Sequence, residues 1–157
     1  MAKVLIAYYS RSGNTEKMAK KIDEVIKKEG VETDLKKIAD VKAKDLLSYD
    51  AIIVGSPTYY GSMAWEVKKL FDESVAFHGK LKGKIGGAFA SANNVGGGNE
   101  TTILDILNAM IVHGMIVQGE PVGDHYGPVA IGAPDERSLK CCERFGKNIA
   151  NLVKKIY

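Results

Sequence analysis

The stretch Ser10-Arg11-Ser12-Gly13-Asn14-Thr15 lies between a short apolar run, Val4 to Tyr8, and a segment with helical periodicity. An apolar run of this length predicts a strand that is buried on both faces of a parallel sheet. After the stretch, apolar residues recur at helical spacing with lysines on the opposite face, and the apolar positions are Met18, Ala19, Ile22, Val25 and Ile26. The stretch is therefore predicted to turn a strand into a helix.

The residue types in this turn are typical of phosphate binding. The first turn of a helix carries unpaired amide groups and the positive end of the helix dipole, so the hydroxyls of Ser10, Ser12 and Thr15 around Gly13 can enclose a phosphate without a lysine. The Gly-Lys-Ser/Thr ending of nucleoside triphosphate loops occurs nowhere in the chain, which argues against a triphosphatase. The same residues are also typical of a helix cap without a ligand, so this loop alone leaves both interpretations open.

The composition indicates one globular domain, residues 1–157, with a net charge of +3. Its lysines are spread along helix faces, which favours a solvated surface over nucleic-acid binding. No apolar run approaches the roughly 18 residues of a membrane span, and the N-terminal run lacks a cleavage pattern, so we expect a cytoplasmic protein without membrane insertion. The only cysteines, Cys141 and Cys142, are adjacent on a predicted helix, so we expect neither a disulfide between them nor a metal site, and we expect Cys142 to pack on the apolar face.

Segments with strand and helix patterns alternate along the whole chain. Further strands are predicted at Val31–Lys37, Ala51–Gly55, Ile85–Ala90 and Met115–Val117, and Asn99 is predicted to cap one of the helices between them. Gly86 and Gly87 are expected to let a helix approach the fourth strand closely. Alternation of this kind implies parallel strands joined by right-handed crossovers, with helices on both faces. We therefore predict an α/β fold: a three-layer, doubly wound, five-stranded parallel sheet.

Two further loops leave the carboxyl ends of predicted strands, the edge at which such sheets bind ligands. One is Pro57-Thr58-Tyr59-Tyr60-Gly61, whose tyrosines either stack on a planar ligand or close over the core. The other is Ser91-Ala92-Asn93-Asn94-Val95-Gly96-Gly97, followed by Gly98, which either brings amides close to a ligand or is a flexible loop without one. A phosphate loop, an aromatic loop and a glycine-rich loop at one edge together suit a planar, phosphorylated heterocycle such as flavin mononucleotide (FMN).

The chain resembles the flavodoxin superfamily over nearly its whole length. The resemblance rests on these motifs: Tyr8-Tyr9-Ser10, Gly13-Asn14-Thr15, Pro57-Thr58, Gly61, Gly96-Gly97-Gly98 with Glu100, His113-Gly114-Met115 and Tyr126-Gly127. It implies the strand order 2-1-3-4-5 and bound FMN. By this resemblance Ser10 to Thr15 hold the phosphate, Thr58 to Tyr60 line the ring and ribityl chain with Tyr60 as the stacking residue, and Ser91 to Gly97 contact the pyrimidine edge.

Within the superfamily, the chain is similar to the quinone reductases of the tryptophan-repressor-binding-protein type. That similarity implies that His113 approaches the flavin and makes it the one candidate catalytic residue, although a lone histidine before a strand is equally typical of a structural residue. The similarity also implies a homo-oligomer, a dimer or a tetramer. His125 and Tyr126 fall in a loop that often closes the site in this family.

Two functional classes, and a third less favoured one, remain open. The first is an electron carrier that exchanges electrons with a redox partner protein through FMN, and the second is an NAD(P)H:quinone oxidoreductase. A flavin-binding regulatory module is the third. No acid, base or nucleophile motif accompanies the flavin loops. The chain is shorter than the quinone reductases that it resembles and lacks much of their insertion, which favours the carrier. Trp65, inside a predicted helix, does not match the tryptophan that sandwiches the ring in acidic carriers.

Overall fold

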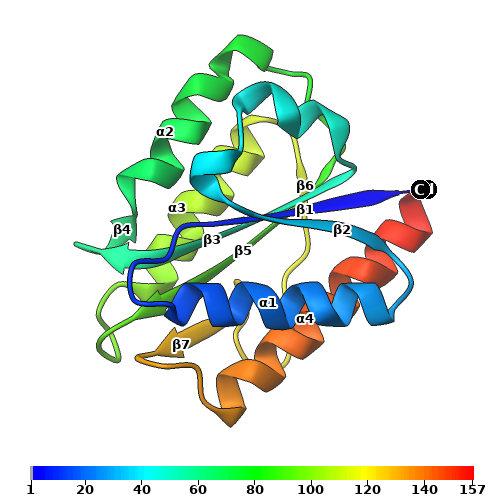
Figure 1. Cartoon of the computed structure of the whole chain (residues 1–157). Helices are drawn as coiled ribbons and strands as arrows, with labels where there is room; N and C mark the ends of the chain where they lie inside the picture. Colours follow the sequence, from blue (N-terminus) through cyan, green and yellow to red (C-terminus); the bar gives the residue numbers. More distant parts are fainter. Residues whose placement is uncertain (1) are drawn as a thin grey trace.

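One central sheet organises the computed structural model, which describes residues 2–157 (Figure 1). Its strands follow the order β2-β1-β3-β5-β6, and neighbours along this path pair in parallel. The strands are β1 (Lys3–Tyr8), β2 (Glu32–Lys37), β3 (Ala51–Tyr59), β5 (Ile85–Ala92) and β6 (Ile116–Val117). Counted as positions across the sheet, this is the predicted order 2-1-3-4-5, and the α/β prediction is confirmed.

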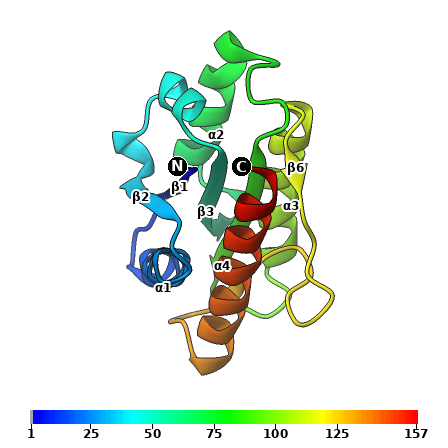
Figure 2. The same ribbon diagram turned by 90° about the vertical axis from the view of Figure 1, so that its right-hand side faces the viewer.

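Helices cover both faces of the sheet and make the outer two layers (Figures 1 and 2). Successive residues of β1 point to opposite faces: Val4 and Ile6 pack in one buried cluster, Leu5 and Ala7 in the other. Every residue from Val4 to Tyr8 is buried for this reason, which explains the uninterrupted apolar run. The first face is covered by α1 (Asn14–Lys28) and α4 (Glu136–Ile156). The second face is covered by α2 (Trp65–Glu73), α3 (Asn99–Val112) and three short 3₁₀ helices, η1 (Ile38–Asp40), η2 (Ala43–Ser48) and η3 (Ser74–Phe77).

The fifth position of the sheet is divided between two short strands. β6 pairs with the start of β5 at Ile85 and Gly86, and β7 (Val129–Ile131) pairs with its end, from Ala90 to Ala92. The predicted strand at Met115–Val117 is therefore only the first half of this edge. Pro121 lies in the segment between the halves, and its lack of an amide hydrogen is compatible with a chain that has left the sheet. A two-residue strand, β4 (Ser62–Met63), pairs antiparallel with the end of β3.

Gly86 and Gly87 allow helices to approach β5 from both faces. A Cβ built on Gly86 would lie 2.8 Å from Met110 Sδ of α3, and one on Gly87 would lie 2.7 Å from the Phe145 ring of α4. The close approach predicted from the glycine pair is thus confirmed, and it involves a helix on each side.

Two local predictions meet different outcomes. Cys142 is fully buried and burial raises the pKa of its thiol to about 12, which confirms a packing role. The predicted cap at Asn99 is wrong by one residue, because Gly98, with φ of 100°, is the N-cap of α3 and Asn99 begins the helix. Within residues 2–157 no helix is long and apolar enough to cross a membrane, and no group of three or more His, Cys, Asp or Glu residues could hold a metal ion.

Candidate functional site

Three loops meet at the carboxyl edge of the sheet, because β1, β3 and β5 run in parallel and end on the same side (Figure 1). Residues 10–15 follow β1, residues 57–61 end β3, and residues 91–98 end β5 and lead into α3. The first and third loops are joined by a buried hydrogen bond between Thr15 Oγ1 and Ser91 Oγ, at 2.8 Å. The structure therefore brings together all three segments that the sequence singled out.

The loop at residues 10–15 combines a helix cap with free donors. Ser10 Oγ accepts hydrogen bonds from the amides of Gly13, at 3.1 Å, and Glu16, at 3.3 Å. Gly13 is the N-cap of α1 with φ of 93°. Five other amides of this turn donate to no acceptor within residues 2–157, and they belong to Ser10, Arg11, Ser12, Asn14 and Thr15. The two interpretations of this loop are thus compatible, since one hydroxyl caps the helix while five amides stay open to an anion.

The loop at residues 57–61 displays two tyrosines. Tyr59 lies edge-on to Tyr9, with ring centroids 6.3 Å apart. Tyr60 is fully exposed, and its φ of 50° makes it the only non-glycine residue with positive φ among the described residues. A bulky side chain in the left-handed region is strained, and such strain concentrates at ligand sites. The loop thus holds an aromatic ring at the surface, in a conformation that no contact of the ring itself explains.

The glycine-rich loop packs directly against the tyrosine loop. A Cβ on Gly98 would lie 2.5 Å from the Cα of Gly61. Ser91 and Ala92 are buried members of β5, whereas Asn93, Asn94, Val95, Gly96 and Gly97 are exposed. The exposed part thus begins at residue 93, and the first two residues of the predicted loop hold it to the sheet.

Two threonines that the sequence analysis missed brace this pair of loops. Thr101 Oγ1 donates to the carbonyl of Gly61 at 2.6 Å, and the hydroxyls of Thr102 and Thr58 are hydrogen-bonded to each other at 3.1 Å. Thr102 is fully buried. A hydroxyl pair in the first turn after a glycine run is the signal that could have identified them, because such hydroxyls bond to nearby backbone.

The segment between β6 and β7 forms a neighbouring cavity of about 370 Å³ that also touches the glycine-rich loop through Val95. His125 and Tyr126 line it, as does Arg137, which pairs with Asp124. Asp124 also accepts from the amide of Val129 at 2.9 Å, so it joins this segment to β7. The sequence analysis placed His125 and Tyr126 in this loop but missed the Asp124–Arg137 pair that anchors it.

His113 lies away from the three loops. It is the C-cap of α3, and α3 runs back along the sheet to the edge where β5 begins, since Ile85 pairs with Ile116 just after it. The structure thus places His113 away from the three loops of its own chain, and its approach to a flavin stays a prediction. The contacts favour the structural alternative, because the side chain is 7% exposed and its Nε2 lies 2.7 Å from Ser74 Oγ.

The surroundings of His113 disfavour its charged form. Ser74 Oγ lies 2.6 Å from the carbonyl of Phe71 and donates its proton there, so His113 Nε2–H donates to Ser74. His113 Nδ1 is then a buried acceptor without a partner in the described part of the chain. Burial, and secondarily the nearby His78, lower the pKa of His113.

This lowered pKa predicts a pH-dependent stability. In the unfolded chain His113 binds a proton near pH 6.5, whereas in the folded chain it does so only at lower pH. The free energy of unfolding should therefore fall as pH drops from about 6.5 toward the folded pKa, by about 1.4 kcal/mol for each unit by which folding lowers the pKa. Chemical denaturation between pH 5 and 7.5 measures it. His113→Gln should reduce the change of the unfolding free energy with pH, whereas His125→Gln, at an exposed position, should not. Equal pH dependence in the two variants would contradict the assignment of this effect to His113.

Comparison with known proteins agrees with this architecture. A family model described as a flavodoxin domain matches residues 5–93. A flavodoxin from Clostridium saccharobutylicum is 40% identical over 99% of both chains, and an NAD(P)H dehydrogenase (quinone) from Archaeoglobus fulgidus is 30% identical over 99% of this chain and all of that protein.

Solved structures give the same result. The structure of a flavodoxin from the domain Archaea has a TM-score of 0.81 at 36% identity, covering 97% of this chain and 99% of the other. A WrbA-like flavodoxin from Agrobacterium tumefaciens has a TM-score of 0.84 at 25% identity, covering 100% of each chain. With the matching domain, the full-length relatives and the shared strand order, the chain belongs to the flavodoxin family.

Proposed function

We propose that this chain is an electron carrier that works through bound FMN, the cofactor of the flavodoxin family. The observation that carries the proposal is the turn at residues 10–15, with five free amides before and at the start of α1 and a hydrogen bond between Thr15 and Ser91 of the glycine-rich loop. Hydrogen bonds to a charged group contribute about 1.5 to 3 kcal/mol each, more than the helix dipole at about 0.3 to 1 kcal/mol. Several such amides suit a terminal phosphate, and the flavin supplies the redox chemistry.

The three loops then have separate roles. The residues at the phosphate are Ser10, Arg11, Ser12, Gly13, Asn14 and Thr15; those along the ring and ribityl chain are Pro57, Thr58, Tyr59, Tyr60 and Gly61; and those at the pyrimidine edge are Ser91, Ala92, Asn93, Asn94, Val95, Gly96 and Gly97. Tyr60 is the proposed stacking residue, since its ring is fully exposed and held in a strained conformation. Exposed backbone from Asn93 to Gly97 provides donors and acceptors for a polar ring edge.

An NAD(P)H:quinone oxidoreductase is the second candidate, favoured by full-length relatives with that name at 30% identity. Against it, the alignment with the Archaeoglobus fulgidus protein spans 190 positions, whereas this chain has 157 residues. The alignment with the Clostridium flavodoxin spans 161 positions. The chain thus has the dimensions of the carrier, and a cytoplasmic location with a redox partner protein completes the proposal.

Two measurements test the proposal. Equilibrium titration should show tight binding of FMN and weak binding of flavin adenine dinucleotide, because the turn is shaped for a terminal phosphate. Stopped-flow mixing of the FMN-loaded protein with NADH or NADPH should show slow reduction. Fast reduction coupled to quinone turnover would establish the oxidoreductase instead, and absence of flavin binding would contradict both.

The bond between Thr15 and Ser91 gives a specific variant. Thr15→Val keeps the size of the side chain but leaves the buried Ser91 hydroxyl without its partner, so FMN affinity should fall by about 1 to 3 kcal/mol. Ser10→Ala, which removes the acceptor for two amides, should have an effect of the same size. Thr15→Ser keeps the hydroxyl that bonds to Ser91 and is the control. Unchanged FMN dissociation constants in Thr15→Val and Ser10→Ala, with native circular dichroism, would refute the role of this turn.

A further inference from the structure

The tip of the hairpin formed by β3 and β4 has a conformation that its sequence does not favour. Tyr59 pairs with Ser62, so the loop of this hairpin consists of Tyr60 and Gly61 alone. Both residues have positive φ, at 50° and 76°, as a type I′ turn requires. Such turns favour Asn, Asp or Gly at the first of these positions, and a tyrosine there is strained. Contacts of the ring do not offset this strain, because the Tyr60 side chain is fully exposed.

One face of α3 holds this hairpin. Residues spaced i, i+3, i+4 and i+7 lie on the same face of a helix. Four residues with this spacing contact the hairpin, and we call them the α3 stripe: Gly98, Thr101, Thr102 and Asp105. The hydroxyls of Thr102 and Thr58 are hydrogen-bonded to each other at 3.1 Å. Gly98 has no side chain and lets the two backbones approach, since a Cβ there would lie 2.5 Å from the Cα of Gly61.

The other two members of the α3 stripe bond to the turn and to the residue that follows it. The Thr101 hydroxyl donates to the carbonyl oxygen of Gly61 at 2.6 Å. The hydroxyl of Ser62, the next residue, donates to the carboxylate of Asp105. Thr101 is thus the side chain of the stripe that holds the turn itself, because its acceptor belongs to one of the two turn residues.

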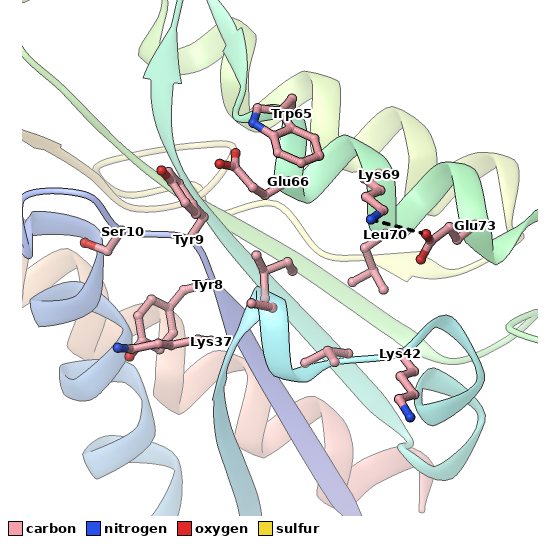
Figure 3. Close-up of a pocket in the computed structure, with 13 residues that line it drawn as sticks. Tyr8, Tyr9, Ser10, Lys37, Lys42, Trp65, Glu66, Lys69, Leu70 and Glu73 are labelled. Atoms are coloured by element: carbon pink, nitrogen blue, oxygen red, sulfur yellow. Dashed lines mark ion pairs between the residues drawn. The ribbon is translucent and has the colours of Figure 1, made fainter.

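On the side of β1, the hairpin adjoins a cavity. Tyr59 meets Tyr9, the residue after β1, edge-on with ring centroids 6.3 Å apart. Tyr9 lines a cavity of about 470 Å³ beside η1 and α2, and Figure 3 shows it with Glu66 and Trp65 at one end of this space. The packing on this side therefore leaves room for the hairpin to move when its bonds to α3 are lost.

We propose that Thr101 is a positioning residue which, with the rest of the α3 stripe, holds Tyr60 in its strained conformation, so that the tyrosine is in place before the flavin binds. This proposal rests on the proposed function and adds to it the cause of the strain. Strained residues persist only where the surrounding structure enforces them, and they concentrate at ligand sites. A backbone that is fixed in advance loses less conformational entropy on binding, which increases affinity.

Tyr60→Asn tests the strain in the full chain without flavin. Asparagine suits this position of a type I′ turn, so Tm should rise by a few degrees. Affinity for FMN should fall about fivefold, because the aromatic ring is lost. Tyr126→Asn is the matched control, since Tyr126 is also an exposed tyrosine but its φ lies outside the left-handed region. The control should not raise Tm.

Thr101→Val tests the positioning role, because it removes the hydroxyl and keeps the shape of the side chain. It should weaken FMN binding about fivefold, and Thr101→Ser should restore the affinity. In the Tyr60→Asn background, Thr101→Val should change FMN affinity less than twofold, because no strained tyrosine remains to be held. The rise in Tm caused by Tyr60→Asn should likewise be smaller in the Thr101→Val background. A hydroxyl with a merely structural role would cost the same affinity in both backgrounds.

Three results would overturn the proposal: an unchanged or lower Tm in Tyr60→Asn, an equal loss of FMN affinity from Thr101→Val in both backgrounds, or full FMN affinity in Thr101→Val. The Tm measurements need no flavin. If the unmodified chain bound no FMN, the proposed function would be contradicted, and the Tm values would still show whether Thr101 holds the turn. Tight FMN binding without coupling between Thr101 and Tyr60 would contradict only the positioning role.

Discussion

Gly98→Ala is expected to lower the affinity for FMN by tenfold or more while the protein stays folded. The added Cβ would lie 2.5 Å from the Cα of Gly61 and 3.3 Å from Thr58 Cγ2, so the tyrosine loop must move away. The φ of 100° adds strain of about 1 kcal/mol or more for any L side chain. Both loops proposed to flank the flavin ring shift together, and a misplaced binding group loses most of its interaction energy. Flavin titration with far-ultraviolet circular dichroism measures the result.

A matched control separates displacement from strain. The control is Gly132→Ala, because Gly132 also has a positive φ, at 66°, and lies outside the three loops. A Cβ added to Gly132 would have no atom within 4 Å. It should lower stability by about 1 kcal/mol, with little effect on FMN affinity. If both variants bind FMN as tightly as the unmodified chain, the contact between the two loops has no bearing on the flavin.

Gly127→Ala is expected to have the largest effect on stability. Its φ is 144°, and a Cβ there would lie 2.0 Å from the carbonyl oxygen of Ala88 in β5. Neither group is a flexible side-chain end, so the backbone between β6 and β7 must withdraw from the sheet. Strain and lost packing of about 3 to 5 kcal/mol correspond to a fall in Tm of about 10 °C for a domain of this size. Calorimetry of the variant checks this value.

Gly79→Ala is the control for this substitution. Gly79 also has positive φ, at 79°, but its added Cβ would have nothing within 4 Å. It should lower Tm by only a few degrees, since the strain of one residue is about 1 kcal/mol. Equal Tm values for Gly127→Ala and Gly79→Ala would show that the backbone relieves the contact with Ala88 without loss of folding free energy.

The fold could be predicted from the sequence because its signals are local. The apolar run of β1 indicates burial on both faces of the sheet. The neighbouring glycines of β5 indicate close helices, and Met110 of α3 and Phe145 of α4 do pack against them. The three loops could be predicted for a similar reason. In a parallel sheet the carboxyl ends of all strands lie at the same edge, so the loops that follow these strands are expected at that edge.

The remainder depends on distances that no short motif encodes. The 14-residue length of α3 decides that His113 lies at the far edge from the three loops. The cavity beside η1 and α2 forms where Val41 and Lys42, which follow η1, lie near Trp65 at the start of α2. The bracing by Thr102 likewise joins residues separated by 44 positions. Such arrangements follow from packing and not from periodicity.

The divided fifth position also bears on how this chain behaves at high concentration. A long outer strand offers a row of free amides and carbonyls to which another molecule can add a strand. Here β6 has two residues and β7 has three, with a projecting segment between them. At the opposite border β2 carries Glu32, Asp34 and Lys36, and Lys3 bridges the two acids at 3.0 Å each. The interrupted edge on one side and the charged edge on the other therefore both disfavour addition of a strand from another molecule.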